Sequence, residues 1–114
     1  MVTGGNGGIG KGIADALASK GSDIVIAARN EDKTAEAVKD IKERFGVKVL
    51  GVKVDVAQET SVQEAVKKAI DEFGKITILV NNAGVNIRKL PQEYTVDEWD
   101  WIMNTNLRGA FLCA

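Results

Sequence analysis

The sequence predicts an α/β fold in which a parallel sheet is covered by helices on both faces. Short, apolar, β-branched runs alternate along the chain with longer segments of helical period. A glycine-rich loop joins the first of these runs to the first helix, and the second run is apolar at every position. We therefore expect a three-layer, doubly wound arrangement of about four strands and four helices.

The first strand is represented by Met1 and Val2, which lead into the glycine-rich loop. A helix is expected from Gly8 to about Lys20, and Gly21 is a natural stop for it. The run 24–28 is typical of a strand buried on both faces. The residues expected on the inner face of the first helix are Ile9, Ile13, Ala16 and Leu17.

Asn30 is placed to cap a second helix, which runs to about Phe45. The third strand is expected over 47–54, and a third helix begins at Thr60 and ends at Gly74. The inner residues expected for these two helices are Ala35, Val38, Ile41 and Phe45, and Val62, Ala65, Val66, Ala69, Ile70 and Phe73.

A fourth strand is expected over 76–80, and a polar loop containing Pro91 follows it. Thr95 and Glu98 have the spacing of a capping box, which predicts that the last helix begins there and continues to the end of the chain. The first strand is very short and no glycine caps the last helix. We therefore expect residues 1–114 to be the N-terminal part of a larger domain.

The composition argues against several classes of function. The chain has 114 residues, 16 acidic and 15 basic side chains and a net charge of -1, a balance that gives no reason to expect binding to nucleic acid or an anionic membrane. It has no histidine and one cysteine, Cys113, so we expect no metal site. No apolar run reaches the roughly 20 residues of a membrane span, and the cysteine usage fits a reducing cytoplasm.

The glycine-rich loop Thr3-Gly4-Gly5-Asn6-Gly7-Gly8-Ile9-Gly10 is the strongest functional signal. Glycines between a strand and a helix permit positive φ and allow backbone N–H groups to approach a pyrophosphate, and the helix N-terminus adds unpaired donors. No Gly-Lys-Ser/Thr follows, which excludes the phosphate loop of NTPases. The alternative is a merely flexible chain start, but the strand–loop–helix context favours a dinucleotide-binding loop.

This loop and three later segments resemble the short-chain dehydrogenase/reductase family. The four motifs are Thr3-Gly4-x-x-x-Gly8-x-Gly10, Asp55-Val56, Asn81-Asn82-Ala83-Gly84 and Asn106-Leu107-x-Gly109-x-Phe111. They occur in the family's order and span the whole chain. The resemblance implies a Rossmann fold, with residues 1–114 as the N-terminal part of its NAD(P)-binding domain. It also implies an oxidoreductase that transfers hydride between a nicotinamide cofactor and an alcohol or ketone.

The resemblance also implies which residues bind the cofactor. Loop residues Thr3, Gly4, Asn6, Gly7, Gly8, Ile9 and Gly10 would lie along the phosphates and the nicotinamide ribose. Asp55 and Val56 would contact the adenine, and Asn82, Ala83 and Gly84 would border the adenosine ribose. Taken alone, Asp55 would be a turn residue at a strand end, and 81–84 an ordinary strand-to-loop turn.

The end of the second strand indicates which dinucleotide is bound. In a Rossmann unit an acidic residue there binds the adenosine ribose hydroxyls, but this sequence has Ala28 followed by Arg29. A guanidinium is suited to phosphate binding, so we predict NADP(H), with NAD(H) as the alternative in which Arg29 is only a solvated loop residue. The loop has no second basic residue at Gly7, where some NADP-using relatives carry one.

The acid/base chemistry of the family is incomplete in this chain. The family uses a tyrosine followed four residues later by a lysine, whereas the single tyrosine, Tyr94, is followed by Glu98. The resemblance assigns one catalytic residue, Asn106, which helps to hold a water in the family's proton relay; a structural asparagine is the alternative. We therefore predict that the chain is inactive by itself.

The sequence leaves three interpretations of the chain open. The chain is the N-terminal part of an enzyme, a non-catalytic dinucleotide-binding half-domain, or a structural fragment that binds nothing. Sugar-like alcohols and 3-oxoacyl compounds are both open as the small-molecule substrate. The resemblance implies a homo-oligomeric full-length protein, in which Trp99 and Trp101 would lie in the subunit interface or pack against the domain.

Overall fold

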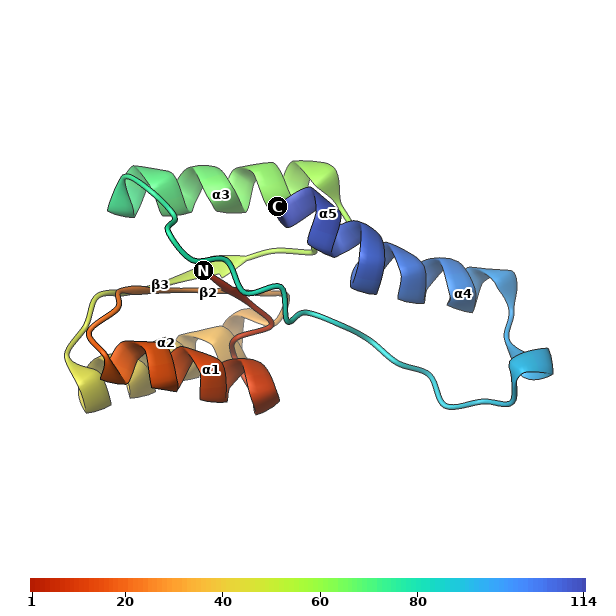
Figure 1. Cartoon of the computed structure of the whole chain (residues 1–114), viewed down its shortest axis with the longest axis horizontal. Helices are drawn as coiled ribbons and strands as arrows, with labels where there is room; N and C mark the ends of the chain where they lie inside the picture. Colours follow the sequence, from red (N-terminus) through yellow and green to blue (C-terminus); the bar gives the residue numbers. More distant parts are fainter.

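The computed structural model describes residues 1–114 and contains a parallel sheet between two layers of helices (Figure 1). The three strands are β1 (Val2–Thr3), β2 (Ile24–Ala28) and β3 (Val49–Lys53), and β2 is the central one. Val2 lies opposite Ile26, and Ile24 opposite Val49. The predicted three-layer, doubly wound α/β class is confirmed, and β2 is buried at every position as expected.

The segment 76–80 does not form the fourth strand that the sequence predicts. It runs beside β1, but only Val80 pairs with it, through an isolated parallel bridge to Val2. The Thr3 N–H donates to the Val80 carbonyl at 3.0 Å, and the Val80 N–H donates to the Met1 carbonyl at 2.9 Å. Because β1 is only two residues long, it offers too few partners for a longer ladder.

Helices α1 (Gly8–Ser19) and α2 (Glu31–Phe45) cover one face of the sheet (Figure 1). Asn30 caps α2 as predicted, since its side chain accepts the Lys33 N–H at 3.0 Å. The core on this face consists of Val2, Ala14, Ala18, Ile24, Ile26, Ile41 and Val49.

The inner faces predicted for these two helices are partly wrong. Ile9 is 79% exposed, and Ala16 and Ala35 are exposed as well. The buried positions are instead Gly10, Ala14 and Ala18 in α1, and Thr34, Ala37 and Ile41 in α2. Small residues allow the axis of α1 to approach the sheet closely, and this packing decides which side of the helix faces inward.

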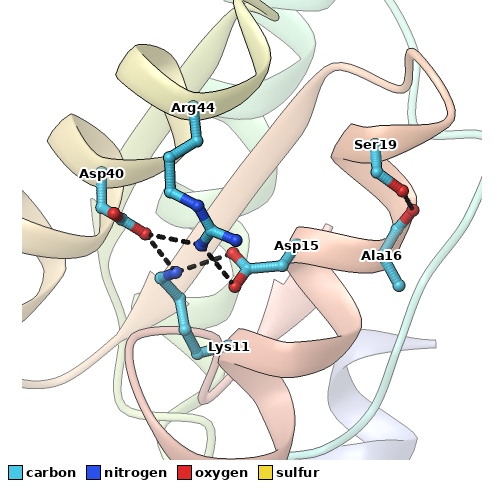
Figure 2. Close-up of polar contacts among 6 residues, drawn as sticks. All are labelled: Lys11, Asp15, Ala16, Ser19, Asp40 and Arg44. Carbon is cyan, nitrogen blue, oxygen red and sulfur yellow. Dashed lines mark hydrogen bonds and ion pairs between the residues drawn. The ribbon is translucent and has the colours of Figure 1, made fainter.

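Four charged side chains join α1 to α2 (Figure 2). Lys11 lies 2.7 Å from Asp15 and 2.6 Å from Asp40. Arg44 contacts the same two carboxylates at 2.9 Å and 3.1 Å. Each cation therefore bridges the two helices, so the helix that follows the glycine loop is tied to its neighbour on the outside of the domain.

Helix α3 (Glu59–Phe73) covers the opposite face of the sheet (Figure 1). It begins one residue before Thr60, and its predicted inner face is confirmed except at Ile70, which is exposed. The core on this side consists of Val25, Ala27, Val52, Val54, Val56, Val62, Ala65 and Ala69.

The last helix is continuous but irregular. After a short 3-10 turn, η1 (Pro91–Glu93), it comprises α4 (Val96–Met103), the π-helical turn η2 (Asn104–Arg108) and α5 (Gly109–Cys113). The predicted capping box is present: the Thr95 hydroxyl accepts the Glu98 N–H, and the Glu98 carboxylate accepts the Thr95 N–H, both at 3.1 Å.

The two ends of the last helix differ in how they are packed. α4 projects away from the sheet, whereas α5 lies against α3 (Figure 1). Trp99 and Trp101 are 59% and 40% exposed, so neither ring is buried against the domain. None of the helices combines the length and the apolar character that crossing a membrane requires.

Candidate functional site

The glycine loop makes a turn that side chains would obstruct. Gly4 and Gly8 have φ values of +65° and +55°, in the left-handed region that favours glycine. A Cβ atom on Gly10 would lie 2.3 Å from Nδ2 of Asn82 and 2.4 Å from the Gly4 carbonyl oxygen. The start of α1 can therefore lie against the loop only because residue 10 has no side chain.

Thr3 and Asn82 hold this loop from behind. The buried Thr3 hydroxyl accepts the backbone N–H groups of Asn82 and Ala83, both at 3.0 Å. The Asn82 side-chain amide donates to the carbonyls of Thr3 at 3.0 Å and Gly4 at 3.3 Å. These bonds join the loop to the segment after Val80, so the ends of both segments are fixed relative to each other.

A cavity of about 540 Å³ opens at the carboxyl ends of the strands, in front of this loop. The predicted site residues that line it are Gly4, Asn6, Gly7, Gly8, Arg29, Asp55, Val56, Asn82, Ala83 and Gly84. The predicted residues that do not line it are Thr3, Ile9, Gly10 and Asn106. Thus four segments that are separate in the sequence, the glycine loop and those at the ends of β2, of β3 and of the segment 76–80, meet around one cavity.

The end of β2 supplies a basic wall. Arg29 is exposed, and no carboxylate lies within 4 Å of its guanidinium. The Asn6 side chain donates to the Thr34 hydroxyl at 3.2 Å and to the Asn30 carbonyl at 3.4 Å, which joins the loop to the start of α2. The backbone beside Arg29 is thus held by hydrogen bonds, and the Arg29 guanidinium is free to bind an anion.

The end of β3 forms the opposite wall. Asp55 makes a local turn, in which its carboxylate accepts the Ala57 N–H at 3.0 Å, and its own N–H donates to the Ser61 hydroxyl at 2.9 Å. Val56 is buried, and a Cβ on Gly109 would lie 2.8 Å from its side chain. The missing side chain at Gly109 therefore lets the last helix approach this wall.

Asn106 lies in the π-helical turn rather than in a regular helix, and its side chain is exposed. Its amide oxygen accepts the Val85 N–H at 2.7 Å, and its amide nitrogen donates to the Val85 carbonyl at 2.8 Å. Both side-chain polar groups are therefore used to hold the segment that follows Gly84. The same turn places the buried Thr105 at the cavity wall.

Sequence reasoning missed several lining residues: Ala27, Ala28, Asn30, Lys33, Val54, Val85 and Thr105. Most of them adjoin predicted site residues in the chain. Lys33 could have been found from the same rule that selected Arg29, because the first turn of α2 lies at the carboxyl edge of the sheet. Thr105 could not, since a π-helical turn has no clear sequence signal.

A second hollow, of about 650 Å³, lies between α2 and the outer edge of β3. It is larger than the cavity in front of the glycine loop, but no loop residue lines it. Its walls come from one helix and one strand only, with Thr34, Val38 and Val52 at its base. We therefore place the functional site in the smaller cavity, where the ends of several strands and a helix N-terminus converge.

Comparison with known proteins agrees with this geometry. A profile of the family described as short chain dehydrogenase matches residues 1–114. The chain belongs to this family. The family resemblance that the four sequence motifs indicate is therefore confirmed over the whole chain.

Similar members of the short chain dehydrogenase family include an uncharacterized oxidoreductase of Thermotoga maritima, 40% identical over all of this chain and 44% of that protein. A 3-oxoacyl-[acyl-carrier-protein] reductase of Staphylococcus epidermidis is 37% identical over 99% of this chain and 46% of its own length. The crystal structure of L-sorbose reductase from Gluconobacter frateurii, complexed with NADPH and L-sorbose, superposes with a TM-score of 0.95 at 38% identity. It is matched over 99% of this chain and 43% of that one. The chain spans a little under half the length of these relatives.

Proposed function

We propose that this chain is the N-terminal part of an NADP(H)-dependent short chain dehydrogenase that transfers hydride between a nicotinamide and an alcohol or ketone. The observation that carries the proposal is the cavity at the carboxyl ends of the strands, which the glycine loop and the N-terminus of α1 border. Family membership supports the same reaction class.

The residues present fit a dinucleotide. Gly4, Gly8 and Gly10 keep the loop free of side chains where a pyrophosphate would approach the backbone. We propose that Thr3, Asn6, Gly7 and Ile9 complete this loop subsite. Thr3 and Gly10 would support the loop from the side that faces away from the cavity. Asp55 and Val56 would border the adenine, and Asn82, Ala83 and Gly84 the adenosine ribose. The bound nicotinamide supplies the hydride donor or acceptor, and these residues position it.

Arg29 favours NADP(H) over NAD(H). Its guanidinium is not occupied by a carboxylate, and Ala28 leaves no acidic group at the end of β2 that would repel a 2′-phosphate. The related L-sorbose reductase was crystallised with NADPH, which supports the same choice.

We propose that Asn106 serves catalysis as a positioning residue, through the segment that its side chain holds. Its side chain fixes both backbone groups of Val85, which lines the cavity directly after Gly84. The interruption of the helix at this residue fits a functional position, because π-helical turns occur often at such sites.

The substrate class that we propose is an alcohol or a ketone. One relative acts on L-sorbose and another is a 3-oxoacyl reductase, so a sugar-like alcohol and a 3-oxoacyl compound both have support. We also propose that the full-length protein is a homo-oligomer, a state supported by exposed apolar residues on the last helix. These residues are Val96, Trp99, Trp101, Leu107 and Phe111.

A non-catalytic, dinucleotide-binding half-domain is the second candidate. These 114 residues contain no tyrosine followed four residues later by a lysine. Both candidates require the dinucleotide cavity, and they differ only in turnover.

Calorimetric titration of the 114-residue chain with NADPH and NADH tests the binding common to both. We expect NADPH to bind more tightly, and Arg29→Asp to weaken NADPH binding at least about tenfold by replacing an attractive charge with a repulsive one. NADH binding should be retained or improved, because an acidic residue at the end of β2 binds ribose hydroxyls. Tighter NADPH binding by Arg29→Asp would contradict the proposed NADP(H) preference.

A further inference from the structure

Lys33 and Gly7 belong to different elements but share one corner of the cavity. Lys33 lies in the first turn of α2, and its side chain reaches across to the glycine loop. A Cβ atom on Gly7 would lie 2.6 Å from Lys33 Nζ and 2.7 Å from its Cε, with no other contact within 4 Å. The Lys33 ammonium therefore occupies the space that a side chain at position 7 would take.

The backbone conformation at Gly7 does not itself require a glycine. Its φ of -174° and ψ of 170° are extended, and any residue adopts them. Gly7 thus differs from Gly4 and Gly8, whose positive φ favours glycine. What the missing side chain provides at Gly7 is room for Lys33.

The charges around this corner favour an anion. No carboxylate lies within 4 Å of the Lys33 ammonium or of the Arg29 guanidinium. The acidic neighbour Glu31 is paired with Lys53 at 3.3 Å. Asp55 is the one acidic residue that lines the cavity, and it lies at the end of β3 with its carboxylate bonded to a backbone N–H. Two unpaired cations on one wall attract a group with two negative charges.

We propose that Lys33 is a second specificity-determining residue for the 2′-phosphate of NADP(H), acting beside Arg29. The inference rests on the proposed NADP(H) function and extends it to a residue on another element. An ammonium on a flexible stem and a planar guanidinium together match a phosphate, since one gives a point charge and the other a paired donor. The second cation that the glycine loop lacks at Gly7 is thus supplied by α2 at the same place.

Lys33→Ala tests the role directly in the 114-residue chain. We expect NADPH to bind about fivefold to tenfold more weakly, a modest loss for a charge-assisted bond that is partly open to solvent. NADH affinity should change less than about twofold. Lys42→Ala is the matched control, because it removes the same charge from an exposed position of α2 that does not line the cavity. Circular dichroism of each variant checks that it is folded.

Moving the cation distinguishes phosphate binding from a structural role. In the double variant Gly7→Lys, Lys33→Ala the extended backbone accepts the new side chain, and the only atoms that would obstruct its Cβ are gone. We expect NADPH affinity to return to within about threefold of the unmodified chain.

The outcomes separate this inference from the function on which it rests. No loss of NADPH affinity in Lys33→Ala, or equal losses for NADPH and NADH, would overturn the role of Lys33 and leave the proposed function intact. Failure of the double variant to regain NADPH affinity would overturn it as well. If the unmodified chain is folded by circular dichroism and binds neither dinucleotide, the proposed dinucleotide site is contradicted, and the inference with it.

Discussion

Gly10 shows how one residue sets the geometry of the loop. Its nearest neighbours are the Gly4 carbonyl and the Asn82 amide, and the latter also bonds to the Thr3 carbonyl. The start of α1, the loop and the segment after Val80 therefore meet at a point with no free volume. Such a contact is sensitive to the addition of a single methyl group, because packed interiors relax only in part.

We expect Gly10→Ala to lower the free energy of unfolding by about 1–3 kcal/mol, since the new methyl group would displace backbone and a bonded amide. Gly12→Ala is the control in the same helix, where a Cβ would meet nothing within 4 Å. It should raise the stability by about 0.5–1 kcal/mol through helix propensity. Urea unfolding measures both values, and equal effects of the two changes would contradict the packing argument.

At the scale of elements, α1 and α2 are connected by the cluster of Lys11, Asp15, Asp40 and Arg44 (Figure 2). Each carboxylate lies between two cations, so the charges alternate around the cluster. Hydrogen bonds from Lys11 and then from Arg44 hold the pKa of Asp40 below its ordinary value of 3.8. The cluster keeps α1, which follows the glycine loop, against α2, which carries Lys33.

The pKa of Asp40 predicts how stability depends on pH. Because folding lowers this pKa, the ionised carboxylate stabilises the fold above about pH 4, and that contribution is lost as the pH falls through the lowered value. We expect Asp40→Asn to reduce stability at neutral pH and to flatten the acid side of the stability curve.

Unfolding by denaturant at several pH values measures this dependence. Asp100→Asn is the control, since Asp100 is an exposed carboxylate outside any ion pair. An unchanged acid limb in Asp40→Asn would show that the cluster contributes nothing to the folded state. High salt should shrink the difference between the two variants, because the charges are partly exposed.

At the scale of the whole molecule, the chain forms a cavity at the carboxyl ends of its strands but places no tyrosine in the lining. Its single tyrosine, Tyr94, is half-buried and donates its hydroxyl hydrogen to the Ile87 carbonyl, away from the lining of the cavity. Proton transfer at a substrate oxygen requires a group within hydrogen-bond reach of that oxygen. No tyrosine–lysine pair at the family's spacing is present in these 114 residues.

We therefore expect the 114-residue chain to bind NADPH but not to consume it when a sugar ketone or a 3-oxoacyl thioester is added. The absorbance and fluorescence of NADPH report the two events separately. A full-length short chain dehydrogenase serves as the positive control for the assay. Steady NADPH oxidation by the purified chain, proportional to its concentration, would contradict this prediction.

The sequence was sufficient where local chemistry decides the structure. The all-apolar run of β2, the Asn30 cap and the Thr95–Glu98 capping box were all predicted correctly. The predicted strand at 76–80 was wrong because pairing depends on the neighbouring strand, and β1 is too short to provide it. The inner face of α1 was partly wrong because small residues, rather than Ile9, meet the sheet.

The sequence by itself determined the class of fold and the glycine loop, because periodicity and backbone freedom are properties of short segments. Only the tertiary structure showed that Arg29, Lys33 and Gly7 border one cavity, and that Asn106 binds the backbone of Val85. Such contacts join residues that are distant in the chain. They depend on how closely the helices approach the sheet, which no local pattern specifies.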